Sequence, residues 1–317
     1  MEIMCKVCGS NKIRNFLDIP NHYQTKKFLS SYEDKGYVWN FIIDYCEECG
    51  FLQIREPIKE EFLYENYLTP SSWKFQPHME HEIELIKKII VKKGKVLEIG
   101  CNDGLFLRKL KDHVQFQTYV GIEPCKDVYK MACKENYNEC IELLNLFFTS
   151  EISKILKEQY GMFDMIYARQ VFEHINDVNS FLGSTHDLMS DDSILMLEVP
   201  DCLPQIKNGD ISFIWEEHVN YFTENTLQLI LIKNGFDIIC LQRYIFSGNA
   251  ITVFCKKASK LSNKSDYHSL EEKNHIRNFW QKFIERINDI IEILNKEKAL
   301  NNRNIVYGGG AWCNRLY

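Results

Sequence analysis

The 317-residue sequence lacks the features that direct a chain to a membrane or to nucleic acid. It has no run of about 18 apolar residues, which a membrane-spanning helix needs. Its N-terminus, MEIMCKVCGSNK, has no apolar region of the kind found in signal peptides. Basic residues are not in excess, because 38 Lys and Arg stand against 44 Asp and Glu, a net charge of −6. An acidic protein releases few counterions from a polyanion, so we expect a soluble, cytoplasmic protein that binds neither nucleic acid nor membranes.

Twelve cysteines are unusual for that compartment, where thiols stay reduced. Four of them form two copies of Cys-x-x-Cys-Gly, with Cys5 and Cys8 in the first copy and Cys46 and Cys49 in the second. A two-residue spacer lets both thiolates of a turn reach one ion, and two such turns complete a tetrahedral sulfur site. The spacing predicts a structural Zn²⁺ ion that performs no chemistry. Iron in the same cage, or thiols that only pack or react with oxidants, are the alternatives.

The central part of the chain alternates strand and helix patterns. Residues 78–93 have apolar residues at helical spacing, and 95–111 read as a buried strand, a glycine turn and a helix. Further strands are predicted at 118–123, 163–168 and 193–199, with a weak one at 140–144, and two late strands at 236–243 and 249–255 can pair antiparallel. This order predicts an α/β fold with a mostly parallel sheet covered on both faces.

The glycine turn after the first of these strands lacks two familiar patterns for nucleotides. It reads Glu98-Ile-Gly-Cys-Asn-Asp-Gly104, which is neither Gly-x-Gly-x-x-Gly nor a phosphate-binding Gly-Lys-Ser/Thr loop. Its glycines still allow a ligand to approach the backbone closely. Glu123 follows the next strand, about 20 residues on, where a carboxylate can accept both hydroxyls of a ribose.

These residues carry a resemblance to a known family. VLEIGCNDG (96–104) and GIEP (121–124) resemble the first two motifs of class I S-adenosylmethionine-dependent methyltransferases. With the cysteine pairs, ARQVFEHINDV (168–178) and EEHVNYFT (216–223), the chain is similar to the sugar-nucleotide C-methyltransferases. The resemblance implies a zinc-binding module at 1–67, a Rossmann-like methyltransferase core at 68–256, and at 257–317 a linker, a helix and the start of a truncated C-terminal Rossmann-like domain.

The resemblance also implies the cofactor, S-adenosylmethionine, and the residues that bind it. The loop would wrap the amino-acid end of the cofactor, Glu123 would bind the ribose, Pro124 and Phe147 would flank the adenine, and residues 168–170 would line the sulfonium side. The full predicted set is Glu98, Gly100, Asn102, Asp103, Gly104, Glu123, Pro124, Phe147, Ala168 and Gln170. Phe147 is equally well interpreted as a core residue.

Methylation of carbon needs a base that removes a proton α to a carbonyl and a group that stabilises the enolate. The resemblance places these groups in 216–222, with His218 as the base, because imidazole titrates near neutral pH, and Glu217 orienting it or holding a sugar hydroxyl. His174 would face the same cavity and donate to the keto oxygen, with Tyr221 in support. Either histidine could instead be structural. Trp215 departs from the family, which usually has Tyr three residues before the histidine.

Three functions therefore stay open. The first is C-methylation of a ketosugar or sugar nucleotide, the second is O-methylation of a sugar or another small hydroxylated molecule, and the third is an inactive zinc-containing scaffold. Residues 64–82, with Tyr67, Ser71, Ser72 and Trp73, are either a lid or an ordinary linker. A capping box at Ser269 and Glu272 begins a helix with one apolar face from Ile276 to Leu294. The sequence leaves the oligomeric state open.

Overall fold

The computed structural model describes residues 3–23, 38–59, 75–135, 140–245, 249–259 and 269–300. The predicted lid residues Tyr67, Ser71, Ser72 and Trp73 lie outside these ranges, as does the predicted strand and glycine turn beyond residue 300. Within the described ranges, no helix combines the length and apolar character needed to cross a membrane.

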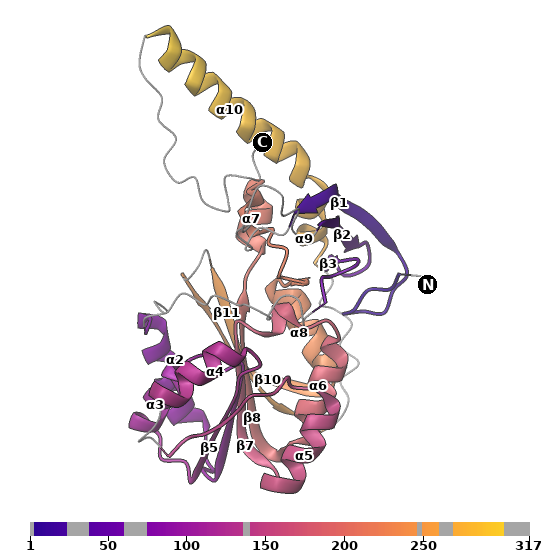
Figure 1. Cartoon of the computed structure of the whole chain (residues 1–317). Coiled ribbons are helices and arrows are strands. Elements are labelled where there is room, and N and C mark those ends of the chain that lie inside the picture. The colour runs from indigo at the N-terminus through magenta and orange to yellow at the C-terminus, as the bar shows by residue number, and fades with distance from the viewer. Residues whose placement is uncertain are drawn as a thin grey trace.

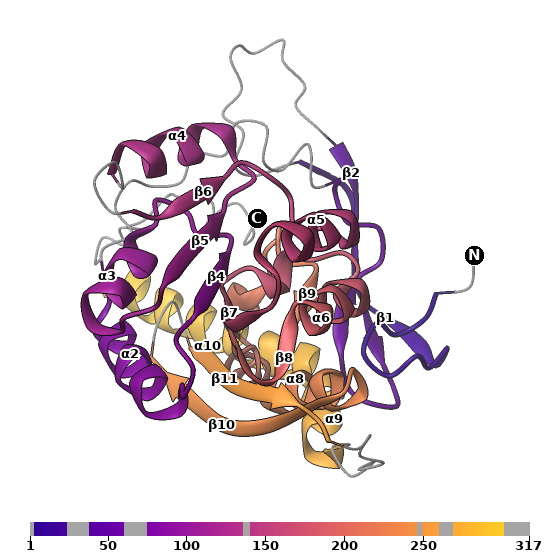
Figure 2. The ribbon, with the colours of Figure 1, turned by 90° about the horizontal axis from the view of Figure 1, so that it is seen from below.

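A seven-stranded sheet forms the centre of the molecule, in the order β10-β11-β8-β7-β4-β5-β6 (Figures 1 and 2). The strands that run parallel are β4 (Lys95–Ile99), β5 (Thr118–Ile122), β6 (Glu142–Leu144), β7 (Phe163–Arg169) and β8 (Met189–Pro200). The two late strands, β10 (Phe236–Tyr244) and β11 (Ala250–Lys257), pair antiparallel with each other, and β11 pairs antiparallel with β8. The predicted α/β fold with a mostly parallel sheet is therefore confirmed.

Helices cover both faces of this sheet, as Figure 2 shows. One apolar core lies under α2 (Pro77–Ile89) and α3 (Leu105–His113), with α4 (Lys126–Glu135) on the same side. The other lies under α5 (Ser150–Tyr160), α6 (Val178–Asp187) and α8 (Glu224–Lys233). Because both faces are buried, the central strands are almost continuously apolar, which is why the sequence shows them as unbroken hydrophobic runs.

A second, four-stranded sheet has the order β1-β2-β3-β9. The strands β1 (Ile13–Tyr23), β2 (Val38–Cys46) and β3 (Leu52–Ile54) belong to the N-terminal module, but the edge strand β9 (Asn220–Tyr221) comes from the segment that the sequence assigns to catalysis. Its register pairs Leu52 with Tyr221 and Gln53 with Asn220. The N-terminal module and the predicted catalytic segment therefore share one sheet, which the sequence did not predict.

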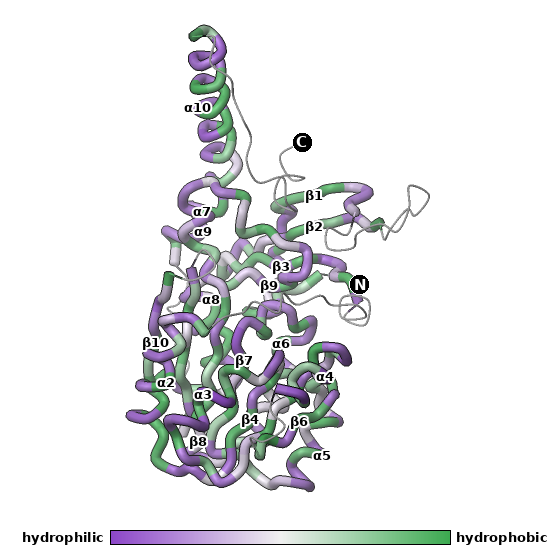
Figure 3. Tube along the Cα trace, turned by 60° about the vertical axis from the view of Figure 1, so that its left-hand side comes forward, coloured by the Kyte–Doolittle hydropathy of each residue, from purple (hydrophilic) through white to green (hydrophobic). Residues whose placement is uncertain are grey.

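The C-terminal part of the described chain is helical and begins as the sequence predicts. The Ser269 side chain accepts a hydrogen bond from the Glu272 amide, but the Glu272 carboxylate bonds Thr223 instead of returning to the cap. The predicted single helix is in fact two, α9 (Leu270–Arg277) and α10 (Phe279–Ala299), which meet at Asn278. Helix α10 projects from the body and carries apolar residues along its exposed length (Figure 3).

Three short elements complete the structure between β7 and α8. They are the 3-10 turns η1 (Phe172–His174) and η2 (Ile211–Phe213) and the helix α7 (Leu203–Asn208). Turn η1 follows β7 directly, so its position at the carboxyl edge of the sheet is fixed by that strand.

Candidate active site

A cavity opens at the carboxyl ends of β4, β5 and β7, where the strand order reverses. The chain adds β5 and β6 on one side of β4, and β7 and β8 on the other, and ligands of open α/β sheets bind at such a point. From the predicted cofactor set, the cavity is lined by Glu98, Gly100, Asn102, Asp103, Glu123, Pro124, Phe147 and Gln170. The other two, Gly104 and Ala168, do not line it, and Ala168 is fully buried in the core.

The loop after β4 is held open by backbone conformation and local hydrogen bonds. Gly100 has a φ of 72°, and a Cβ atom there would lie 2.5 Å from a Val171 methyl group. Asn102 also adopts a positive φ, of 51°. The Asn102 side chain accepts a hydrogen bond from the Asp103 amide at 2.7 Å, and Asp103 accepts one from the Leu105 amide at 2.9 Å. The loop is therefore preformed around the cavity and leads directly into α3.

The carboxylate of Glu123 spans the loops after β4 and β5. One oxygen accepts a hydrogen bond from the Asn102 amide and the other accepts one from the Cys125 amide, each at 2.9 Å. Burial raises the pKa of this carboxyl, and these two hydrogen bonds lower it. Glu123 is 8% exposed, so its remaining acceptor capacity faces the cavity that it lines.

Glu98 is a buried acid at the end of β4. It accepts a hydrogen bond from the Tyr167 hydroxyl at 3.1 Å. Burial raises the pKa of Glu98 to about 8, although the charge of Arg169 and the Tyr167 hydrogen bond oppose this. A positively charged ligand in the cavity would stabilise its ionised form.

A network of buried charges lies beside the cavity, around Arg169. Its guanidinium lies 2.7 Å from a Glu198 oxygen and 3.2 Å from a Glu82 oxygen. Glu198 also accepts a hydrogen bond from the Gln170 amide at 2.9 Å and lies 3.5 Å from His78. Burial alone would raise the pKa of Glu198, but Arg169 and the hydrogen bonds from His78 and Gln170 lower it to about 2. This network fixes Gln170, which has a φ of 53°, on the cavity wall.

Three residues of this network, His78, Glu82 and Glu198, were not predicted from the sequence. Glu82 stands on the apolar face of α2 between Met79 and Ile83, where a carboxylate is out of place unless it is paired in the core. A buried acid in the apolar pattern of this helix, four residues after His78, was the one feature of the sequence that could have indicated a buried polar network.

The structure brings the two predicted catalytic histidines together. The rings of His174 and His218 lie 4.9 Å apart, centroid to centroid, at an interplanar angle of 74°. His174 lines the cavity and donates from Nδ1 to the backbone carbonyl of Glu217 at 2.8 Å. Its Nε2 lies 3.8 Å from a carboxylate oxygen of Glu173. His218 is not among the residues that line the cavity, but its ring contacts that of His174, which does line it.

The rest of the segment 215–222 is held in place by buried hydrogen bonds. The Tyr221 hydroxyl donates to the carbonyl of Trp215 at 2.9 Å, and its side chain is 1% exposed. The Asn220 amide donates to the carbonyl of Ile175 at 2.7 Å, which ties the segment to the turn that carries His174. Neither Tyr221 nor Glu217 lines the cavity.

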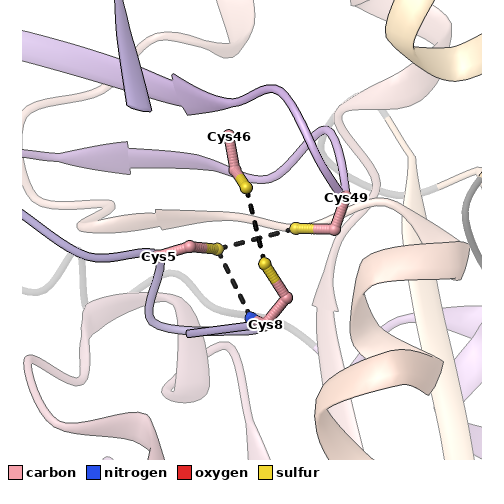
Figure 4. Close-up of side chains that lie close together, drawn as sticks. All are labelled: Cys5, Cys8, Cys46 and Cys49. Carbon is pink, nitrogen blue, oxygen red and sulfur yellow. Dashed lines mark hydrogen bonds between the residues drawn. The ribbon is translucent and has the colours of Figure 1, made fainter. Parts of the chain in front are cut away.

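The four predicted metal-binding cysteines converge at one point in the N-terminal module (Figure 4). The sulfur atoms of Cys5 and Cys49 lie 3.5 Å apart, as do those of Cys8 and Cys46, and all four sulfurs lie within 4.8 Å of one another. Zn–S bonds of about 2.3 Å place the sulfurs of a tetrahedral site roughly 3.8 Å apart. The cysteines therefore fit a closed tetrathiolate site, and Lys233 of α8 donates to the carbonyl of Cys8 beside it.

Comparison with protein families gives a match to the methyltransferase domain over residues 73–241. Among curated proteins, the chain is 25% identical over 264 residues to the C-methyltransferase NovU of Streptomyces niveus, covering 80% of this chain and 61% of that protein. It is 23% identical over 158 residues to the human mitochondrial ubiquinone biosynthesis O-methyltransferase, covering 45% of this chain and 42% of that protein. The chain thus spans less than two thirds of the length of either relative.

Similar solved structures have low sequence identity to this chain. An S-adenosylmethionine-dependent methyltransferase from Anabaena variabilis is 16% identical, with a TM-score of 0.46. The alignment covers 56% of this chain and 83% of that protein's chain. The protein PH0226 from Pyrococcus horikoshii is also 16% identical, with a TM-score of 0.45, and covers 63% of this chain and all of its own.

Proposed function

The chain belongs to the methyltransferase-domain family, and on that premise we propose that it transfers a methyl group from S-adenosylmethionine to a sugar or sugar nucleotide. The observation that carries the proposal is the cavity at the strand-order reversal, whose wall holds the preformed loop of residues 100–104 and the Glu123 carboxylate. The C-methyltransferase relative supports transfer to carbon, and the resemblance of the motifs to those of sugar-nucleotide C-methyltransferases supports a sugar acceptor.

The cofactor fits the residues that line the cavity. Glu123 would accept hydrogen bonds from the two ribose hydroxyls, since both of its oxygens are already oriented by backbone amides. Pro124 and Phe147 would flank the adenine, and Asp103 would bind the amino group of the methionine end. When bound, S-adenosylmethionine supplies an electrophilic methyl group on a sulfonium. Gln170, held by Glu198, would line the sulfonium side.

The histidine pair supplies the acid and base for carbon methylation. His218 would take the proton α to the keto group of the acceptor. Its ring contacts that of His174, which lines the cavity. The hydrogen bond from Nδ1 of His174 to the Glu217 carbonyl fixes the orientation of the ring. A protonated His174 would donate to the oxygen of the enolate and stabilise its negative charge.

O-methylation is the second candidate, and Trp215 favours it. In the sugar-nucleotide C-methyltransferases that this chain resembles, a tyrosine precedes the histidine by three residues. Trp215 has no phenol, so this position offers no hydroxyl that could accept or exchange a proton. The second relative, an O-methyltransferase, is consistent with this alternative. His218 would then deprotonate a hydroxyl, and no enolate would form.

A structural Zn²⁺ ion is part of the proposal. Cys5, Cys8, Cys46 and Cys49 would hold it and leave no open position for chemistry. Its effect on function would be indirect, because the sheet that it stabilises ends at β9, the strand that follows His218.

The experiment that tests the proposal uses full-length protein, labelled S-adenosylmethionine and 4-ketosugar nucleotides in deuterated water. We expect exchange of the α proton and methylation of the adjacent carbon, both reduced at least about 100-fold in His218→Asn, because general base catalysis contributes that much. The matched control is His113→Asn, an exposed histidine at the end of α3, which should react at the wild-type rate. Methylation of a hydroxyl without exchange would favour the second candidate, and no methylation of any acceptor would contradict both.

A further inference from the structure

The Glu173 carboxylate is buried with no hydrogen-bond partner for either oxygen among the described residues. The residue is 1% exposed and follows Phe172 in the turn after β7. An ionised carboxylate without a partner is costly to bury, so such groups are protonated, paired or bound to a metal. Nε2 of His174 lies 3.8 Å from one of its oxygens, which is longer than a hydrogen bond.

Two imidazoles face this carboxylate. One donor atom each from Glu173, His174 and His218 lie within 4.8 Å of one another. The hydrogen bond from Nδ1 of His174 to the Glu217 carbonyl assigns the proton to Nδ1 and leaves a lone pair on Nε2, toward Glu173. Histidines that bind metals usually make this kind of hydrogen bond with the other ring nitrogen.

We propose that Glu173, His174 and His218 form a binding site for one divalent transition-metal ion, of the class that accepts mixed imidazole and carboxylate ligands, such as Mn²⁺, Fe²⁺, Co²⁺ or Zn²⁺. Metal–ligand bonds of about 2.1 Å place neighbouring donor atoms roughly 3.0 to 3.5 Å apart, so small side-chain rotations close the site. His174 lines the cavity, and three protein ligands leave coordination positions open on that side.

A second cluster of histidine and glutamate side chains differs from this site in the charge that surrounds it. His78, Glu82 and Glu198 also lie within reach of one another. The single positive charge of Arg169 lies 2.7 Å from Glu198 and 3.2 Å from Glu82, and it lowers the pKa of both carboxyl groups. A cation there would meet a fixed positive charge, whereas Glu173 has no such partner within the described residues.

This inference goes beyond the proposed function and does not depend on it. A metal ion at this site occupies a ring nitrogen of His218 and so excludes its action as a base. Metal binding and base-catalysed exchange should therefore compete, while a bound ion could instead hold an acceptor oxygen as a Lewis acid.

The test titrates Mn²⁺ into the full chain with zinc in the cysteine site and follows the free-ion signal by electron paramagnetic resonance. Mn²⁺ prefers nitrogen and oxygen ligands, so it should not displace zinc from four thiolates. We expect one ion per chain in the wild type and at least about tenfold weaker binding in Glu173→Gln and in His218→Asn. His113→Asn should bind as tightly as the wild type.

Folding of the variants is checked by their thermal unfolding without metal. Glu173→Gln keeps the size of the side chain, so without metal it should be about as stable as the wild type. Mn²⁺ should raise the melting temperature of the wild type but not of this variant. The absence of Mn²⁺ binding in the wild type, or equal binding by wild type and Glu173→Gln, would overturn the proposal.

Discussion

Replacing Asn220 with alanine tests whether β9 holds the turn that carries His174. The Asn220 side chain is 1% exposed, and its amide donates to the carbonyl of Ile175 at 2.7 Å, with the carbonyls of Phe172 and Glu173 at 3.3 and 3.4 Å. Without the amide, the Ile175 carbonyl loses this partner, which costs about 1–3 kcal/mol. The volume lost from the side chain adds to this cost, so we expect the free energy of unfolding to fall by about 2–3 kcal/mol.

Urea unfolding followed by tryptophan fluorescence measures this change, together with a thermal midpoint lowered by roughly 6 °C. The matched control is Asn15→Ala, because Asn15 is exposed and its side chain donates to the nearby carbonyl of Leu17 at 3.2 Å. That variant should lose less than about 0.5 kcal/mol. The reasoning would be refuted if Asn220→Ala unfolded at the same urea concentration as Asn15→Ala.

Three further predictions concern the cavity and the cysteine site. Glu98 has a pKa raised to about 8 in the folded protein, so its contribution to stability is complete below the unfolded value of about 4.3 and is lost as the pH rises through 8. Glu98→Gln should therefore flatten the decline of unfolding free energy between pH 5 and 8, by at most about 4 kcal/mol, because each pH unit contributes about 1.4 kcal/mol; an unchanged pH profile would contradict the shift. Gly100→Ala should destabilise the fold by about 1–3 kcal/mol in urea and weaken S-adenosylhomocysteine binding at least about tenfold, because its Cβ would clash with Val171 at a φ of 72°. Cys46→Ser should reduce the zinc content measured by mass spectrometry from one ion per chain to none and unfold the N-terminal module, and retained zinc would show that these cysteines do not form the site.

The convergence of the glycine turn and Glu123 on one cavity could be predicted, because local sequence determines where each of them lies. A strand, a glycine turn and an acidic residue after the next strand occupy adjacent segments, so Gly100 and Glu123 reach the same cavity through the parallel pairing of β4 with β5. The cysteine pairs are also local, since each pair lies within one turn. Such features need only the alternation of strand and helix to bring them together.

The parts that the sequence did not reveal depend on contacts between distant segments. Glu82 of α2 and Glu198 of β8 are 116 residues apart, since 198 − 82 = 116, and only packing brings both to Arg169. The pairing of Asn220 with Gln53 likewise depends on how the N-terminal module docks. The break at Asn278 separates two helices whose apolar positions keep one helical spacing, so periodicity alone could not locate it.

Calorimetric titration of S-adenosylhomocysteine tests the central claim, that the cavity beyond β4, β5 and β7 is the cofactor site. The account predicts one saturable site per chain and at least about tenfold weaker binding in Glu123→Gln, because an amide has one acceptor oxygen where the carboxylate has two. The control is Glu151→Gln, an exposed acid in α5, which should bind like the wild type. No binding heat at millimolar ligand, or equal affinity in Glu123→Gln, would contradict the account.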